Sequence, residues 1–335
     1  MSGLDARQQA TGSASVNATK APDGWFYRVP VTIGGQNFLL QPDSGSTKSW
    51  VYNTLLPASD TTGHDVFDPS KSPSFSQTGV VATSNYSSGG SYTGDEALVP
   101  VQVGDVTMPT AEVDLPTQMV GLESTAGMDG TFGLSPASTL GQSLMPQLNQ
   151  SLFTADLRRD GASLTGTLDF GLVDPTKFTG SLSSFDASQL NFTWRGTCSS
   201  FTVGRVPSNN AGSIACSFDT GSSDIGMSSD LFSFYAQMVP GVTSNSSGYV
   251  RPCNAAPPPD LSITIGNGVQ AVVPGGMTVW PPDPDDGNCY GAMQDLGDTG
   301  PSEIIFGLPF FFAHFVVFGW GNKQVMIGQK AVASV

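Results

Sequence analysis

The sequence predicts an all-β protein made of two lobes. Its 335 residues are many for one hydrophobic core and suit two lobes of ordinary domain size. The chain contains 40 glycines and 24 prolines but only 12% charged residues, a composition that favours short strands and tight turns over amphipathic helices. Each half also carries an Asp-x-Gly turn just after an apolar, strand-like run. We therefore expect two similar β-rich units, each with an aspartate at a turn.

The first half begins with a predicted β-hairpin. Strand signals alternate through residues 26–33, and after two glycines a second apolar run, 38–40, leads to Asp43. Farther along, residues 85–94 run into the alternating segment 97–104 and predict a second hairpin with a glycine-containing tip. On its residues alone, this second hairpin is a surface hairpin with incidental aromatic side chains.

The second half repeats the plan. Residues 192–194 and 200–203 are predicted strands, and after a polar turn the run 213–218 leads to Asp219. Sequence identity between the halves is low, so the repeat rests on the placement of the two aspartate motifs and not on periodicity. It predicts pseudo-twofold lobes. The predicted units are an N-terminal extension at 1–24, an N-terminal lobe with Asp43 at 25–170 and a C-terminal lobe with Asp219 at 171–335.

Two tripeptides carry the chemistry, Asp43-Ser44-Gly45 and Asp219-Thr220-Gly221. Each continues with two small hydroxyl residues, in a turn where glycine lets the backbone bend sharply and approach a ligand. Two carboxyl groups brought close together can share one proton, so that one acts as a base while the other acts as an acid. A single Asp-Thr-Gly is a common turn, but the pair predicts general acid–base catalysis.

The charge of the chain narrows the range of partners. The formal net charge of −15 argues against a nucleic-acid partner, because phosphate binding needs a cationic surface. The same acidity fits an acid-adapted secreted protein or ordinary solubility. No apolar run is long enough to span a membrane, and the N-terminus lacks the pattern of a signal peptide, as expected if a leader and a propeptide had been removed.

Cysteines and sequons indicate an oxidising compartment. The four cysteines allow three disulfide pairings. Disulfides persist outside the cytosol, so we expect a secreted, extracellular or otherwise oxidised location. Five Asn-x-Ser/Thr sequons fit a secreted glycoprotein, although chance alone produces some in a chain rich in serine and threonine. The sequon asparagines are Asn17, Asn85, Asn149, Asn191 and Asn245.

Other catalytic chemistries find less support. The chain has two histidines, His64 and His314, and the second lies in the aromatic run 310–318, which predicts a buried strand. A histidine triad or a zinc site would need partners at spacings that the sequence does not offer, so we expect no metal and no cofactor. A glycosidase with two carboxylates is formally possible, but it does not explain the Gly-Ser context at both aspartates.

The stretch from Asp43 to Trp50, together with the motif at Asp219, resembles the pepsin-like aspartic peptidases, most closely their secreted fungal members. The resemblance covers about residues 25–329 and implies a bilobal fold with a β-hairpin flap. It also implies an aspartic endopeptidase that hydrolyses peptide bonds at acid pH and prefers apolar residues. Segments resembling the interlobe strand pair and the two apolar-apolar-Gly supports of the catalytic loops are 157–161 with 165–171, and 128–134 with 303–308.

The resemblance also implies roles for individual residues. Asp43 would donate a proton to the scissile carbonyl, and Asp219 would activate water as the general base. Ser46 and Ser222 are expected to hydrogen-bond the outer carboxylate oxygens, and Tyr86 to be the flap tyrosine. The residues expected to bind substrate are Gly45, Ser46, Tyr86, Ser88, Met128, Thr131, Gly221, Ser222 and Ser223, and those expected to support the loops are Ser44, Trp50 and Thr220.

Disulfides and partners are implied in the same way. In the family pattern, Cys253 pairs with Cys289, which leaves Cys198 and Cys216 for a second bridge outside that pattern. The expected partners are a peptide or protein substrate and a pepstatin-type inhibitor, with neither nucleic acid nor a membrane span. The expected state is a monomer.

Several residues depart from the family pattern. Ser44 replaces a threonine, Pro42 removes a backbone donor from a strand expected to be central, Ser88 replaces an acidic flap residue, Leu308 an aspartate and Thr131 a bulkier aliphatic residue. Without an acidic flap residue, an apolar side chain is expected at substrate position P1, because a lysine there would be buried unpaired. The changes leave a second hypothesis, a fold reused as a non-peptidase: a binding protein or an enzyme acting on a small molecule.

Overall fold

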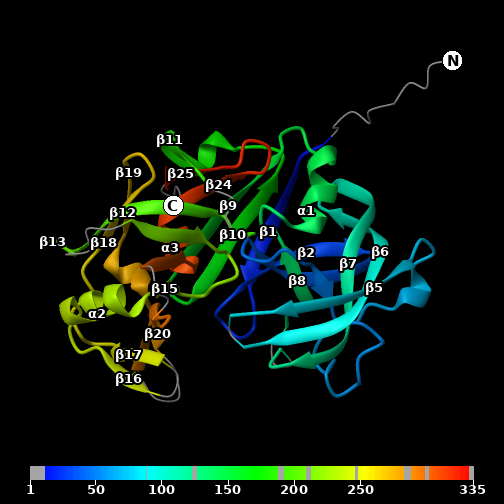
Figure 1. Ribbon diagram of the computed structural model, residues 1–335, viewed down its shortest axis with the longest axis horizontal. Coiled ribbons are helices and arrows are strands. Elements are labelled where there is room, and N and C mark those ends of the chain that lie inside the picture. Colours follow the sequence, from blue (N-terminus) through cyan, green and yellow to red (C-terminus); the bar gives the residue numbers. More distant parts are fainter. Residues whose placement is uncertain are drawn as a thin grey trace.

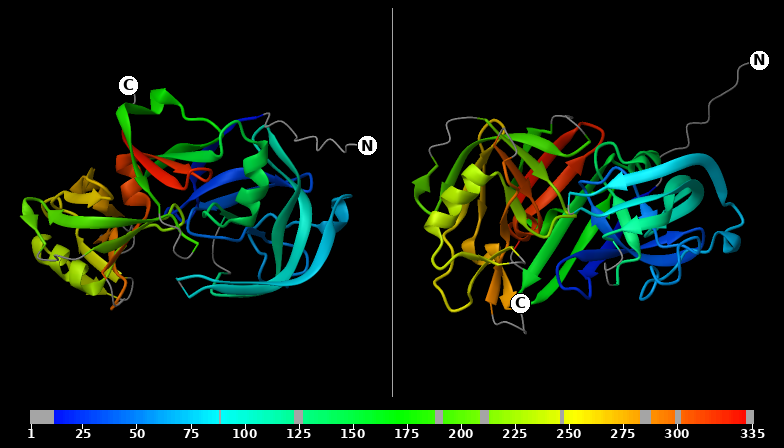
Figure 2. Two further views of the ribbon diagram at one scale, coloured as in Figure 1. Left: turned by 45° about the horizontal axis from the view of Figure 1, so that its top comes forward. Right: turned by 60° about the horizontal axis from the view of Figure 1, so that its bottom comes forward.

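The computed structural model describes residues 12–87, 89–122, 127–187, 192–208, 213–245, 248–282, 288–298 and 302–331. These residues form mainly β-strands, arranged in three sheets, as the composition predicts. Figure 1 shows two lobes, one blue to cyan and one yellow to orange, on either side of a green and red sheet. The views in Figure 2 show the same bilobal arrangement.

An antiparallel sheet joins the two lobes. Its strands, in order, are β11 (Phe178–Asp186), β25 (Gln324–Lys330), β24 (His314–Gly319), β9 (Leu152–Asp160), β10 (Ser163–Phe170) and β1 (Ala14–Lys20). The hairpin of β9 and β10 turns at Gly161, so the segments that resemble the interlobe strand pair do pair with each other. Strand β1 was not predicted and pairs along β10. Because this sheet takes strands from both sides of residue 171, the proposed division of the chain there stays a prediction.

The N-terminal lobe continues from the same sheet. Its strands, in order, are β2 (Tyr27–Ile33), β3 (Gln36–Asp43), β8 (Gly130–Gly133), β4 (Trp50–Val51), β7 (Val106–Val120), β6 (Ser91–Val103) and β5 (Ser76–Asn85). The predicted first hairpin is β2 and β3, joined through Gly34 and Gly35, both of which have positive φ. Alternate residues of both strands are buried, which anchors the strand that leads to Asp43.

The C-terminal lobe has its own sheet. In order it contains β19 (Val269–Val273), β18 (Leu261–Ile265), β12 (Arg195–Val203), β14 (Ile214–Phe218), β23 (Glu303–Phe306), β15 (Ile225–Met227) and β22 (Met293–Asp295), with β13 (Val206–Pro207) beside β12. The predicted strand at 192–194 is wrong: β12 begins only at Arg195, and Phe192 lies in a turn with a φ of 72°. The predicted strand before Asp219 is confirmed as β14.

A small sheet and a few short helices complete the fold. The sheet contains β16 (Thr243–Asn245), β17 (Gly248–Pro252), β21 (Asn288–Gly291) and β20 (Val279–Pro282). The α-helices are α1 (Thr139–Leu144), α2 (Ser229–Met238) and α3 (Leu308–Ala313), and the 3₁₀ turns are η1 (Pro69–Lys71), η2 (Met145–Gln147), η3 (Pro175–Lys177) and η4 (Gly275–Thr278). None of the helices in the described ranges is both long and apolar enough to cross a bilayer.

Helix α3 corrects the prediction of one continuous strand at 310–318. Only His314–Gly319 form a strand, whereas the preceding residues are helical. Pro309 lies in the first turn of α3, where proline lacks no needed hydrogen bond and its φ suits a helix. Both segments are buried and aromatic, so burial alone did not distinguish the helix from the strand.

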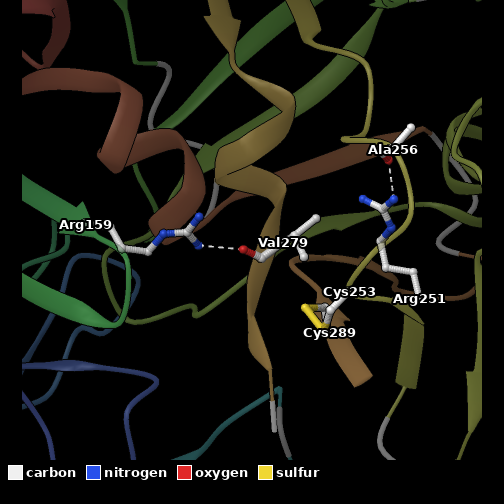
Figure 3. Close-up of a disulfide and its surroundings, with 6 residues drawn as sticks. All are labelled: Arg159, Arg251, Cys253, Ala256, Val279 and Cys289. Atoms are coloured by element: carbon white, nitrogen blue, oxygen red, sulfur yellow. Dashed lines mark hydrogen bonds between the residues drawn. A yellow bond between two sulfur atoms is a disulfide. The ribbon is translucent and has the colours of Figure 1, made fainter. Parts of the chain in front are cut away.

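Two disulfides join neighbouring strands and loops. Cys198 of β12 is bonded to Cys216 of β14, and Cys253 is bonded to Cys289 of β21 (Figure 3). Both expected pairings are therefore present. The first bridge lies in the sheet that carries the strand leading to Asp219, and the second fixes the long loop after β17.

Candidate active site

Two parallel strand pairs present the two aspartates. Strand β3 runs parallel to β8, with Asp43 opposite Gly133, and β14 runs parallel to β23 up to Phe218 and Phe306. A Cβ on Gly133 would lie 2.4 Å from the Lys48 carbonyl oxygen, and one on Gly307 would lie 2.1 Å from that of Asp224. Only glycine allows these catalytic loops to pass so close to their supports. The two apolar-apolar-Gly segments thus pack behind the loops as the resemblance implies.

Ser44 and Thr220 tie the two loops together. The Ser44 amide donates to Thr220 Oγ1 (3.0 Å), and the Thr220 amide donates to Ser44 Oγ (2.9 Å). Each hydroxyl then donates to a carbonyl of the opposite loop, Ser44 to Phe218 and Thr220 to Pro42, at 2.9 Å. Serine therefore makes every hydrogen bond that this position needs. Pro42 is tolerated in β3 because the antiparallel pairing with β2 ends at Leu40, and at Pro42 only the parallel pairing with β8 continues.

The two carboxyl groups face each other across the loops. The Gly45 amide donates to Asp43 Oδ1 (2.8 Å) and to Asp219 Oδ1 (3.2 Å), while the Gly221 amide donates to Asp219 Oδ1 (2.9 Å). A Cβ on Gly45 would lie 2.9 Å from the Asp219 carboxyl, and one on Gly221 would lie 2.5 Å from that of Asp43. Each glycine thus leaves room for the carboxyl of the opposite loop.

The pair is electrostatically strained and asymmetric. Burial, followed by the charge of Asp219 and a hydrogen bond to it, raises the pKa of Asp43 well above its usual range. Ser222 Oγ donates to Asp219 Oδ2 (2.7 Å). The matching bond expected from Ser46 is not formed, because its hydroxyl donates to the Lys48 carbonyl (3.0 Å). The anion is therefore better stabilised on Asp219 than on Asp43.

The predicted second hairpin is a flap that reaches the site. Strands β5 and β6 pair along their length, and the cyan hairpin points from its own lobe toward the other (Figures 1 and 2). Trp50 Nε1 donates to the Tyr86 hydroxyl (2.8 Å), and burial, then the charge of Asp43, raises the pKa of Tyr86 to about 12. Asn85 is exposed, as expected for the neighbour of an inward-facing tyrosine. Ser88 lies outside the described residues.

The cleft between the lobes consists of two cavities that meet at the aspartates. One, of about 450 Å³, is lined by predicted residues Tyr86, Met128, Thr131, Gly221, Ser222 and Ser223, and the other, of about 420 Å³, by Gly45, Ser46 and Tyr86. The structure thus brings together all the predicted substrate-binding residues that it describes. Lining residues that the sequence analysis missed include Phe26, Gln41, Leu122, Asp224, Leu296, Phe192, Arg195 and Glu303. For these residues the sequence offered one signal, the position of Asp224 just after the second aspartate motif.

A group of three carboxylates lies at the base of the flap. Glu96, Glu112 and Asp114 are close enough together to hold an ion. However, the Lys48 ammonium lies 2.5 Å from Glu112, 3.4 Å from Glu96 and 3.8 Å from Asp114. Because the single Lys48 ammonium lies within 4 Å of all three carboxylates, the group is an ion-pair network linking the first catalytic loop to the flap strands.

Comparison with known proteins identifies the family. The family model of the eukaryotic aspartyl proteases matches residues 26–330. The chain belongs to this family. Among similar eukaryotic aspartyl proteases, penicillopepsin-1 from Penicillium janthinellum is 31% identical over 335 residues, covering 96% of this chain and 100% of that protein. Penicillopepsin-1 from Penicillium rubens is 34% identical (96% and 82% covered), and aspergillopepsin-1 from Aspergillus clavatus is 32% identical (91% and 79%).

Proposed function

We propose that this protein is an aspartic endopeptidase that hydrolyses peptide bonds at acid pH through Asp43 and Asp219. The observation that carries the proposal is the carboxyl pair, with Asp43 buried and Asp219 half-buried, in which each aspartate faces the glycine of the opposite loop. Membership of the aspartyl protease family supports the same activity and does not favour reuse of the fold as a non-peptidase. The paired loops also retain all their mutual hydrogen bonds, although serine replaces the first threonine.

Hydrogen bonding suggests which aspartate carries the shared proton. Asp219 accepts from the Gly45 amide, the Gly221 amide and the Ser222 hydroxyl, so it is the better anion. Burial and the neighbouring charge keep the proton on Asp43. Asp219 is thus the general base and Asp43 the general acid.

The reaction then needs only water and the shared proton. Asp219 takes a proton from a water molecule as its oxygen attacks the scissile carbonyl carbon, and Asp43 gives its proton to the carbonyl oxygen. The resulting diol collapses when Asp219 passes its proton to the leaving nitrogen, the C–N bond breaks and Asp43 recovers a proton from a hydroxyl. No covalent acyl-enzyme forms.

The residues of the flap and of the cleft walls indicate which substrate side chain the enzyme prefers at P1. Tyr86, held by Trp50, lines both cavities together with the two aspartates, and in the larger cavity Met128 and Leu122 are among its apolar neighbours. An apolar side chain beside Tyr86 and Met128 buries more apolar surface than a polar one, so an apolar P1 residue is preferred. A pepstatin-type compound, which mimics the diol, is expected to occupy the same cleft.

Two disulfides suggest an oxidising, extracellular setting, because disulfides persist where thiols are not kept reduced. Secretion as a monomeric glycoprotein is our proposal. Its support is that the sequon residues Asn17, Asn85 and Asn149 are all exposed. Mass spectrometry of protein made in a glycosylating host would test the glycans, and sedimentation would test the monomer.

The deciding experiment is cleavage of a denatured protein and a peptide library at acid pH, with and without a pepstatin-type inhibitor. We expect inhibitable cleavage with apolar residues at P1. A folded, correctly processed protein that cleaves nothing across acid pH would overturn the proposal. Cleavage dominated by lysine at P1 would leave the class intact but contradict the assigned P1 wall.

A further inference from the structure

A third aspartate lies in the cleft beside the catalytic pair. Asp224 lines the cavity of about 450 Å³ on the C-terminal side, opposite Met128 and Thr131 of the N-terminal lobe. Its Oδ1 accepts from Trp280 Nε1 (3.0 Å) and its Oδ2 from Ser223 Oγ (2.8 Å). Each carboxylate oxygen therefore has one neutral donor and room for another. The side chain is oriented and partly satisfied, but its charge is not compensated.

No lysine, arginine or histidine in the described ranges forms an ion pair with Asp224. Burial raises the pKa of Asp224, and its two hydrogen bonds only partly oppose that effect. The Arg159 guanidinium lies over the Trp280 ring, 5.5 Å from its centroid. It donates to the Val279 carbonyl, as Figure 3 shows, and also to the carbonyl of Gly276. The cation that packs on Trp280 is thus already used by other partners.

Other ionisable groups on the surrounding elements are also engaged or of the same sign. Asp295 of β22 accepts from Ser229 Oγ (2.8 Å), and Glu303 of β23 pairs with Arg195 (3.1 Å). The catalytic pair, five residues before Asp224 and across the cleft, adds negative charge and no cation. A cation brought by the substrate would therefore meet an oriented carboxylate with no competing partner.

We propose that Asp224 is a specificity-determining residue that selects a lysine or arginine side chain at one position of the peptide substrate. Successive side chains of an extended peptide point to opposite sides, so a residue next to one that packs on the Tyr86 and Met128 wall faces the Asp224 wall. Much of the rest of that cavity is apolar, with Phe26, Trp50, Leu122, Met128 and Leu296 among its residues. A bound peptide excludes water there, which strengthens a charge-assisted hydrogen bond to Asp224.

The selectivity depends on pH in a defined direction. Because the pKa of Asp224 is raised, acid protonates it and removes its attraction for a cation, and rising pH restores that attraction. Titration of the catalytic pair changes the turnover of both peptides and is present in Asp224→Asn as well. The ratio of kcat/KM between two peptides that differ at one side chain, compared between wild type and that variant, therefore isolates Asp224.

The test uses peptides that are identical except for lysine or norleucine, an uncharged analogue that lacks only the terminal ammonium, placed at each position in turn. At one position we expect wild type to favour lysine about tenfold or more in kcat/KM, with a ratio that rises with pH. Asp224→Asn, which keeps an acceptor for Trp280, should bring that ratio to about one and remove its pH dependence. Asp174→Asn removes an equal charge at the exposed start of η3 and should leave the ratio unchanged.

The inference rests on the proposed peptidase function, and the outcomes separate the two. Cleavage with no lysine preference at any position, or a preference that survives in Asp224→Asn, overturns the role of Asp224 alone. If wild type cleaves neither peptide, the peptidase proposal fails, and calorimetric binding of the same pairs tests Asp224 directly, with equal affinities contradicting it. If Asp224→Asn does not fold, a wild-type ratio that stays constant with pH overturns the inference.

Discussion

At the residue scale, two serines in equivalent loops behave differently. Ser222 donates to the Asp219 carboxylate, whereas Ser46 donates to the Lys48 carbonyl and leaves Asp43 with amide donors only. A hydrogen bond to a charged acceptor contributes about 1.5–3 kcal/mol. That difference is large enough to decide which member of a pair that shares one proton is ionised.

The two carboxyls should be individually indispensable. Asp43→Asn and Asp219→Asn keep the side-chain size but each removes the exchange of the shared proton, so we expect each to lower kcat by about 1000-fold or more. Circular dichroism should show an unchanged fold. Peptide cleavage that remains within tenfold of wild type in either variant would contradict the mechanism.

The serine asymmetry gives a matched pair of variants. Ser222→Ala removes a donor from the general base, so kcat should fall by about tenfold or more. Ser46→Ala should leave kcat within about twofold, because its hydroxyl does not reach the carboxyl pair. Equal losses in the two variants would mean that both serines stabilise the charged pair.

At the element scale, the flap is held over the site by a hydrogen bond between two side chains that are 36 residues apart in the sequence. Trp50 belongs to β4 and Tyr86 follows β5, yet the indole donates directly to the phenol. Around them Tyr52, Tyr92, Met119 and Leu122 form a separate apolar cluster. The base of the flap is therefore packed as a small core of its own.

A double-mutant cycle tests this contact. Trp50→Phe and Tyr86→Phe each remove the same hydrogen bond and should each lower kcat/KM by about two- to tenfold. The double variant should be little worse than the more affected single variant, which corresponds to a coupling of about 1 kcal/mol. Effects that simply multiply would show that the two side chains act independently.

The bridge between β12 and β14 should stabilise the strand that leads to Asp219. Its cysteines are 18 residues apart, and the chain-entropy model gives about 3 kcal/mol for a loop of that size. Cys198→Ala/Cys216→Ala should lower the free energy of unfolding in guanidinium by about that amount, and Cys253→Ala/Cys289→Ala, with a separation of 36, by about 4 kcal/mol. An unchanged unfolding midpoint in either double variant would contradict the corresponding bridge.

At the scale of the whole molecule, buried carboxyls adapt the fold to acid. Burial raises the pKa of Asp43 and also raises the pKa of Asp114, at the flap base, to about 6, against which a bond from Tyr92 and the charge of Lys48 act. Such groups hold protons in the folded chain that the unfolded chain releases. The folded state therefore binds more protons in mild acid, and its stability falls as the pH rises.

Asp114 sets the pH range over which this loss of stability should be seen. Unfolded aspartate ionises near pH 4, so between about pH 4 and 6 the free energy of unfolding should fall by about 3 kcal/mol on its account and then level off. Asp114→Asn should flatten that slope in guanidinium titrations across the window. Asp174→Asn is the control, because exposed hydrogen bonds lower the pKa of Asp174 and place its titration below the window. An unchanged slope in Asp114→Asn would rule out the assignment.

The sequence by itself determined the catalytic pair, the paired loops and the second hairpin, although the family resemblance was needed to identify that hairpin as a flap. These features depend on short-range rules: small residues at fixed spacing after an apolar strand, and alternation that sends Tyr86 inward and Asn85 outward. The β2–β3 hairpin and the strand before Asp219 were predictable for the same reason. Their local signals and their tertiary environments agree.

Only the tertiary structure decided the features that depend on long-range contacts. Asp224 meets Trp280 across 56 residues, β1 pairs along β10 across the interlobe sheet, and Ser46 turns to Lys48 while its counterpart turns to an aspartate. The aromatic run before His314 divides into a helix and a strand because its surroundings bury both halves, so that no polar face marks the boundary. Motif spacing fixes what each loop can do, but packing between distant segments fixes which neutral donors and charges each aspartate meets.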